Sequence, residues 1–285
     1  MLPAQTDFSG LSISRRPIGV FDSGIGGLTV AAELQRRLPH EDIFYIGDTA
    51  RVPYGGRSQT TIERYSFEIS SVLLAQHAKM VVVACNTASA LAVPQLKKKL
   101  PVPVTGVITP GAKAAVAATR KGHIGVIGTR GTIRSKAYER AIHALAPEMR
   151  VSSQECPMLV PAIEEGWLDD PITDSIIARY LEELVSSGID TLVLGCTHYP
   201  LLKPALKRYL GSSIQLVDSA ENCAIAVQQL LAEHDLENGT SAGEGVMHVA
   251  ATDATDGFLR VAEKALGLHV GEVQIVDVQS VAAGV

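Results

Sequence analysis

Two of the four cysteines, Cys85 and Cys196, lie in matching sequence surroundings. Each follows an apolar run and a small residue, and each is followed by a threonine and then by a helical pattern with a proline and a basic pair. The two segments are MVVVACNTASALAVPQLKKKL from Met80 and TLVLGCTHYPLLKPALKRYL from Thr191, and with one residue dropped they align Thr87 with Thr197, Pro94 with Pro204 and Lys97 with Lys207. This echo predicts an internal repeat with one cysteine in each half.

A thiol at the carboxyl end of a parallel strand, directly before a helix, is placed for acid–base chemistry. A helix N-terminus stabilises a thiolate, so we expect the pKa of both thiols to lie below the ordinary value of about 8.5. If the two halves face each other, a carbon acid between Cys85 and Cys196 loses its proton to one sulfur and gains another from the opposite sulfur. That exchange inverts a stereocentre.

Other interpretations of the cysteines stay open at this point. Cysteines are often core residues, which suits Cys156 and Cys223 because neither has a matched partner. A zinc site is disfavoured, since the sequence contains no CxxC or HxxxH pair. A nucleophilic Cys196 with His198 as its base is a conventional pair, but it leaves Cys85 unexplained.

The glycine-rich run DSGIGG, from Asp22 to Gly27, follows a strand-like run and opens a helical one. Such a turn offers backbone N–H groups to an anion. It lacks both the Gly-Lys-Ser/Thr ending of a P-loop and the GxGxxG spacing of a dinucleotide site, so a small carboxylate fits better than a nucleotide. Asp22 and Ser23 are expected to face the ligand, with Asp22 accepting from an ammonium group. The alternative is a tight turn with capping side chains.

Short β-rich runs alternate with helical patterns along the chain, which predicts parallel sheets covered by helices on both faces. The expected strands are Ile18–Asp22, Ile43–Gly47, Met80–Cys85, His123–Gly128, Thr191–Gly195 and Ile214–Asp218. Clear helices are expected at 60–77 and at 172–186, the latter capped by Asp170 and begun by Pro171. The first 15 residues are expected to be a loose tail, and 238–245 a surface loop.

A second echo, PIGVFDSGIGG from Pro17 against HIGVIGTRGT from His123, supports the repeat. The fold class predicted is therefore α/β, with two similar α/β domains that have mainly parallel sheets. A pseudo-two-fold axis is expected to relate them and to place the active site in the cleft between them.

Composition narrows the function classes. The 285 residues are 46% hydrophobic and 19% charged, with a net charge of −5, which argues against nucleic acid or an anionic membrane as a partner. The basic run Lys97–Lys99 is expected on a solvated helix face. No apolar stretch approaches the roughly 20 residues of a membrane span, and no signal peptide is evident. Four cysteines fit a reducing, cytoplasmic location.

Six blocks of the sequence together carry a resemblance to a known family. They are DSGIGGLTV from Asp22, YIGDTARVPYG from Tyr45, ACNTAS from Ala84, IGTRGT from Ile127, VPAIEEG from Val160 and GCTHYP from Gly195. In this combination the chain resembles the glutamate racemases of the aspartate/glutamate racemase superfamily, from about Pro17 to Leu231.

The resemblance implies racemisation of L- and D-glutamate without pyridoxal phosphate, metal or any other cofactor, supplying D-glutamate for peptidoglycan. It implies a first domain formed by 1–107 plus 218–285, which carries Cys85, and a second formed by 108–217, which carries Cys196. It also implies a homodimer. In some relatives with longer N-termini, a cell-wall precursor regulates activity, so such an activator is a possible partner here.

By the same resemblance, Cys85 takes the proton from D-glutamate and Cys196 takes it from L-glutamate, assisted by Asp22, Glu164 and His198. The matching substrate-binding positions are Asp22, Ser23, Tyr54, Gly55, Asn86, Thr87, Thr129, Thr197 and His198. Asp48 matches another acidic position in the cleft; the alternative is that Asp48 only holds a loop. Many donors are needed because glutamate carries two carboxylates and its α-proton is a very weak acid.

Two other functions remain to be separated from glutamate racemisation. One is racemisation of aspartate or another amino acid. The other is binding of a small molecule in the same cleft without catalysis, although binding alone needs neither thiol.

Overall fold

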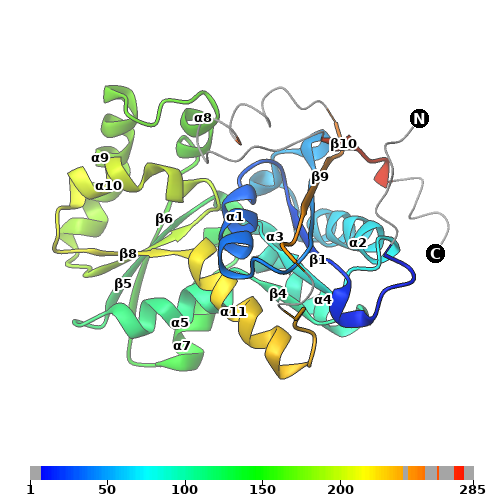
Figure 1. Cartoon of the computed structure of the whole chain (residues 1–285). Helices are drawn as coiled ribbons and strands as arrows, with labels where there is room; N and C mark the ends of the chain where they lie inside the picture. The colour runs from blue at the N-terminus through cyan, green and yellow to red at the C-terminus, as the bar shows by residue number, and fades with distance from the viewer. Residues whose placement is uncertain (1–7, 240–242, 254–261, 263–272, 279–285) are drawn as a thin grey trace.

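The computed structural model describes residues 8–239, 243–253, 262 and 273–278. Its strands form two sheets, each with helices on both faces (Figure 1). The strands are β1 (Ile18–Asp22), β2 (Ile43–Gly47), β3 (Met80–Val83), β4 (Val104–Gly106), β5 (His123–Gly128), β6 (Arg150–Glu155), β7 (Thr191–Gly195), β8 (Gln215–Asp218), β9 (Met247–Ala251) and β10 (Gln274–Ile275). The predicted α/β class with two sheets is confirmed.

The two sheets repeat one topology. The first has the order β10-β9-β2-β1-β3-β4 and the second the order β6-β5-β7-β8, so β2-β1-β3-β4 corresponds to β6-β5-β7-β8. The pairings are parallel in both sheets. Cys85 and Cys196 come just after β3 and β7, which are equivalent strands. The pseudo-two-fold relation itself stays a prediction.

Four strands were not predicted from the sequence. Strand β6 reads RVSSQE and is half exposed because it lies at the edge of the second sheet, where one face needs no apolar side chains. Strand β4 has three residues, and β10 has two. Strand β9 pairs with β2 from Met247 opposite Ile43, so the chain returns to the first sheet after completing the second.

Helices cover both faces of each sheet. They are α1 (Leu28–Arg37), α2 (Gln59–Ala75), α3 (Asn86–Leu91), α4 (Val93–Lys99), α5 (Ile108–Ala118), α6 (Arg130–Arg134), α7 (Ala137–Leu145), α8 (Leu159–Glu164), α9 (Pro171–Ser186), α10 (Lys203–Leu210) and α11 (Ser219–Glu233), with short 3-10 turns η1 (Ile13–Arg15), η2 (Thr49–Arg51), η3 (Tyr54–Gly56) and η4 (Tyr199–Leu202). The predicted helices correspond to α2 and α9, and Asp170 caps α9 by accepting from Ile172 N. Lys97–Lys99 are exposed on α4, as expected.

The cores follow the alternation of side chains along each strand. In β3, Met80 and Val82 pack toward α1 and α11, whereas Val81 and Val83 pack toward α2, α3 and α4. The second sheet divides in the same way, between α8, α9 and α10 on one face and α5 and α7 on the other. Each buried valine contributes roughly 1.5–3 kcal/mol. This double-sided burial holds the strand ends, and therefore the cysteines, in fixed positions.

Helix α11 joins the two halves, because it packs on α1 of the first half and on α5 of the second (Figure 1). The domain boundaries at 107/108 and 217/218 stay a prediction. None of the described helices is long and apolar enough to cross a membrane.

The expectation of a loose tail over the first 15 residues was wrong for residues 8–15; residues 1–7 lie outside the described part. Phe8 is buried and meets the ring of His248 on β9 edge-to-face at 5.8 Å. The buried amine of Lys79, which is paired with Glu41, donates to Ser14 O at 2.5 Å. Of the predicted loop 238–245, residues 240–242 lie outside the description; Asn238 N donates to Glu41 Oε1 at 2.7 Å.

Candidate active site

A cavity of about 410 Å³ lies between the two halves. Its lining segments come after the carboxyl ends of β1, β2 and β3 in the first sheet and of β5, β6 and β7 in the second, as expected for a ligand site in parallel sheets. The lining residues are Ser23, Gly24, Val52, Pro53, Tyr54, Gly55, Gly56, Cys85, Asn86, Thr87, Thr129, Arg130, Pro157, Val160, Pro161, Glu164, Cys196, Thr197 and His198. They include every predicted site residue except Asp22, and Asp48 is also absent.

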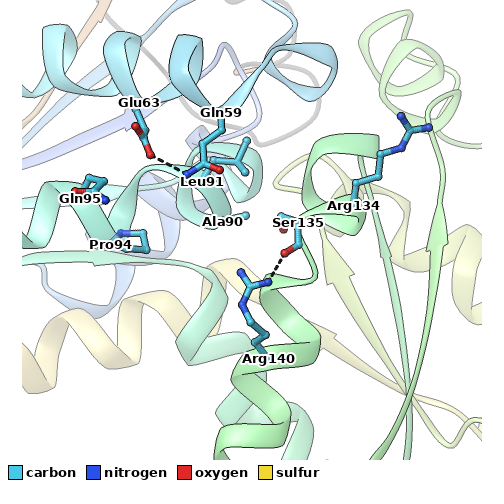
Figure 2. A pocket seen from close by; sticks show the side chains of 9 residues that line it. All are labelled: Gln59, Glu63, Ala90, Leu91, Pro94, Gln95, Arg134, Ser135 and Arg140. Carbon is cyan, nitrogen blue, oxygen red and sulfur yellow. Dashed lines mark hydrogen bonds between the residues drawn. The ribbon is translucent and has the colours of Figure 1, made fainter.

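A second cavity, of about 370 Å³, lies between α2, α3 and α4 on one side and α6 and α7 on the other (Figure 2). Gln59 donates to Glu63 in it, and Arg140 donates to Ser135 O. No cysteine or histidine is among its lining residues. The acid–base groups gather in the first cavity, which is therefore the candidate active site.

Cys85 caps the N-terminus of α3. Its sulfur accepts from Ala88 N at 3.5 Å and lies 3.5 Å from Ser23 Oγ. Burial, and secondly the charge of Asp22, raise the pKa of Cys85 to about 12 despite these two hydrogen bonds, which lower it. The predicted lowering by the helix N-terminus was wrong for this thiol, because α3 is short and the sulfur is desolvated. Cys85 is therefore a protonated thiol at neutral pH.

Cys196 has a different partner. Its sulfur lies 3.8 Å from His198 Nδ1, and His198 Nε2 lies 3.1 Å from Glu164 Oε1. Burial lowers the pKa of His198, but hydrogen bonds and charges from Cys196 and Glu164 outweigh it and raise that pKa to about 10. The expected helix does not begin directly after Cys196, since the 3-10 turn η4 begins at Tyr199. The neighbour of the Cys196 sulfur is therefore a histidine side chain rather than a helix end.

Asp22 lies beneath the cavity instead of lining it. Its Oδ2 accepts from Gly24 N at 3.1 Å and from Gly27 N at 2.9 Å. These two N–H groups of the glycine-rich turn are thus occupied by the chain's own carboxylate, which corrects the expectation that they bind a ligand anion. Within the described residues Oδ1 is buried without a hydrogen-bond partner. The turn fits the alternative interpretation, a tight turn closed by a capping aspartate.

The glycine-rich turn also allows the two halves to approach closely, which sequence reasoning missed. A Cβ atom on Gly26 would lie 2.4 Å from His198 Nδ1 and 2.6 Å from Thr197 Oγ1. Thr29 Oγ1, at the start of α1, lies 3.0 Å from Thr197 O and donates to it. The first half therefore packs against the loop that carries Cys196 and His198. Only glycine fits at position 26, because any side chain there would clash with this loop.

Hydroxyl groups from both halves meet at one wall of the cavity. Thr87 Oγ1 of α3 lies 2.9 Å from Thr129 Oγ1, which precedes α6, and 3.4 Å from Thr132 Oγ1. Thr132 was not predicted as a site residue, although it stands in the IGTRGT block. Each hydroxyl is both a donor and an acceptor, so this wall can reorganise its hydrogen bonds around a carboxylate.

Asp48 holds the adjoining loop, whose Gly55 lies against Thr129. It is fully buried and accepts from the Tyr54 hydroxyl, from Arg51 and from Thr252 Oγ1 at 2.9 Å. Arg51 also pairs with Glu68 on α2. Of these residues only Tyr54 lines the cavity. Asp48 therefore holds a loop, which was the alternative interpretation of this residue in the sequence.

Cys156 and Cys223 lie in hydrophobic cores, where burial raises the pKa of both thiols. This agrees with their interpretation as core residues. Within the described part of the chain, no cluster of three or more His, Cys, Asp or Glu side chains is arranged to hold a metal ion.

Comparisons with known proteins place the chain in a family. A family model described as Asp/Glu/Hydantoin racemase matches residues 28–230. The glutamate racemase of Geobacter metallireducens is 49% identical over 265 residues, which are 93% of this chain and 98% of that relative.

Solved structures agree. Glutamate racemase isoform RacE1 from Bacillus anthracis has a TM-score of 0.88 at 42% identity, covering 93% of this chain and 98% of that one. Glutamate racemase from Francisella tularensis, in complex with D-glutamate, has a TM-score of 0.86 at 37% identity and covers 94% and 99%. The resemblance found in the sequence blocks is confirmed. The chain belongs to the Asp/Glu/hydantoin racemase family and is an amino-acid racemase, an isomerase.

Proposed function

We propose that this enzyme interconverts L- and D-glutamate by moving the α-proton between Cys196 and Cys85, without a cofactor. The observation that carries the proposal is the pair of thiols after equivalent strands of the two halves, both lining one cavity. The relatives named glutamate racemase support glutamate as the substrate.

From L-glutamate, the Cys196 thiolate removes the α-proton, and the electron pair of the broken C–H bond stays on the α-carbon. The Cys85 thiol then delivers its proton to the opposite face, forming the new C–H bond of D-glutamate. Cys196 ends as a thiol and Cys85 as a thiolate, which is the state that acts on D-glutamate. The raised pKa of Cys85 supports a thiol at that position, as the step from L-glutamate requires.

The surrounding groups suit a substrate with two carboxylates and one ammonium group. Hydroxyl and amide groups of Ser23, Asn86, Thr87, Thr129 and Thr197 line the cavity and supply donors for the two carboxylates, and Tyr54 and Gly55 close it on one wall. Donors aimed at the α-carboxylate stabilise the charge that develops on proton removal. Glu164 orients His198, and buried Asp22 supplies negative charge near Cys85.

Four further parts belong to the proposal. D-glutamate produced by the enzyme feeds peptidoglycan synthesis. The mechanism requires free thiols, and all four cysteines are free, so we propose a reducing, cytoplasmic location. We also propose that the enzyme is a homodimer and that a cell-wall precursor activates it.

The test is α-hydrogen exchange. Purified enzyme, freed of metal and pyridoxal phosphate, is incubated with D-glutamate in deuterated water, and optical rotation and deuterium at Cα are followed. We expect rotation to fall to zero while deuterium enters Cα. Binding of glutamate with no exchange would overturn the proposal. Exchange with aspartate but not with glutamate would overturn the choice of substrate.

A further inference from the structure

Tyr138, a residue of α7 in the second half, contacts the first residue of α3 in the first half. Its hydroxyl donates to Asn86 Oδ1 at 2.8 Å, and both side chains are 2% exposed. Asn86 directly follows Cys85 and lines the cavity, whereas Tyr138 does not. The bond therefore acts on the cavity from outside it.

The tyrosine ring has little freedom to move. A Cβ atom on Gly111 of α5 would lie 3.1 Å from Tyr138 Cε1, and one on Gly195 of β7 would lie 3.1 Å from its Cε2. The ring thus fills the space that these two glycines leave. Burial raises the pKa of Tyr138 well above its ordinary value, so the hydroxyl keeps its proton and remains a donor.

The other end of the Asn86 amide has no partner. Its Nδ2 is buried and makes no hydrogen bond to any described residue. A buried amide N–H₂ group without a partner costs free energy, and such groups are rare in native structures and often have a functional role. Since Tyr138 occupies the oxygen, the nitrogen is the polar atom of this side chain that is left for a ligand in the cavity.

We infer that Tyr138 is a positioning residue: it fixes the Asn86 amide so that Nδ2 donates to a carboxylate of the bound amino acid. The inference rests on the proposed function for the identity of the ligand. It adds that this substrate contact, made by the first half, depends on a hydrogen bond from the second. An amide left free to flip would present its oxygen to the carboxylate and repel it.

The test is a double-mutant cycle on kcat and KM for glutamate. Tyr138→Phe removes only the hydroxyl, and we expect KM to rise about tenfold, the worth of one hydrogen bond to a charged group, with kcat changed by less than about threefold. In an Asn86→Ala background, the same substitution is expected to change kcat/KM by less than about twofold, because its target is gone.

A matched control distinguishes positioning from general destabilisation. Tyr199 is also buried and donates its hydroxyl to a backbone oxygen, Cys156 O, at 2.9 Å. Effects of Tyr199→Phe and Asn86→Ala should multiply, since the two side chains bond to different partners, Cys156 O and the Tyr138 hydroxyl, and act separately. Thermal unfolding of each variant records any loss of stability.

Three outcomes would overturn the inference: a Tyr138→Phe enzyme with unchanged KM, a loss carried by kcat alone, or multiplying effects in the double mutant with Asn86→Ala. The wild-type exchange assay separates this failure from failure of the proposed function. If wild type exchanges the α-hydrogen of glutamate and the cycle shows no coupling, only the role of Tyr138 is lost.

Discussion

The two halves of the molecule place a cysteine after equivalent strands, β3 and β7, yet they surround it differently. The Cys85 thiol donates to Ser23 Oγ, and its sulfur accepts from Ala88 N. Both partners are neutral, the Asp22 carboxylate lies nearby, and burial and then that charge raise the pKa of Cys85 to about 12. Cys196 has an imidazole that is itself held by Glu164. The backbone repeats, but the charges around the two sulfurs do not.

This difference matters for the proposed mechanism, because proton transfer between two sulfurs needs them in opposite protonation states in each half-reaction. If both sulfurs had identical surroundings, both would rest as thiols or both as thiolates, and neither state can transfer a proton across the substrate. A carboxylate lies near the Cys85 sulfur, whereas an imidazole whose pKa is raised to about 10 lies beside the Cys196 sulfur, so the local charges around the two sulfurs are opposite in sign. The repeated backbone therefore places the two sulfurs at equivalent positions. The side chains that differ between the halves set the charge around each sulfur.

Removing either sulfur tests the roles of the two cysteines most directly and has the largest expected effect. Cys85→Ala and Cys196→Ala should each lower racemisation by at least about 10⁴-fold, because each removes one of the two proton carriers that the proposed mechanism requires. The residual exchange should be one-sided. Cys85→Ala retains deuterium exchange at Cα of L-glutamate, and Cys196→Ala retains it for D-glutamate, as mass spectrometry of the recovered substrate measures.

Cys223→Ala, which alters a core thiol on α11, serves as the control for thiol loss outside the cavity. Racemisation at more than about one tenth of the wild-type rate in either cavity variant would contradict the two-thiol mechanism. Exchange of the same enantiomer by both variants would contradict the assignment of one sulfur to each face.

The contact between the halves gives the next largest effect. Gly26→Ala places a Cβ atom 2.4 Å from His198 Nδ1, so the imidazole must leave the line between Cys196 and Glu164. We expect kcat to fall about 100-fold, as for loss of a positioned acid–base group. The control is Gly10→Ala, where an added Cβ meets nothing within 4 Å. Steady-state kinetics in both directions that left kcat within threefold of wild type would show that His198 tolerates displacement.

The sequence could predict the elements whose signals are local. Buried strands such as β1 and β7 were found with their observed ends, because they are mostly apolar runs and are buried at every position. Both thiols were found because the repeat places them at equivalent positions. Strand β6 was missed, since an edge strand carries polar residues such as Ser152 and Ser153.

The contacts between halves could not be predicted in this way. Gly26 against His198, and Tyr138 against Asn86, join residues more than 50 positions apart, and no local pattern records such a contact. The raised pKa of Cys85 was missed for a related reason. A helix start is visible in sequence, whereas the desolvation that outweighs it depends on the packed structure.

The smallest expected effect concerns Glu164, the carboxylate beside His198. Its substitution tests, through the pH dependence of activity, whether the charge around Cys196 differs from that around Cys85. Glu164→Gln keeps the shape of the side chain and removes its charge, which helps to raise the pKa of His198 to about 10. Because the raised value stabilises the imidazolium, activity from L-glutamate should be present below that pKa and lost as pH rises through it. In the variant, this alkaline loss should begin at lower pH, and kcat near neutral pH should fall by about threefold to tenfold. The exposed neighbour Glu165 does not line the cavity, so Glu165→Gln should leave the profile unchanged. An unshifted alkaline limb in Glu164→Gln would mean that the partner of Cys196 does not depend on this carboxylate, and the charge asymmetry between the two sulfurs would then rest on Asp22 alone.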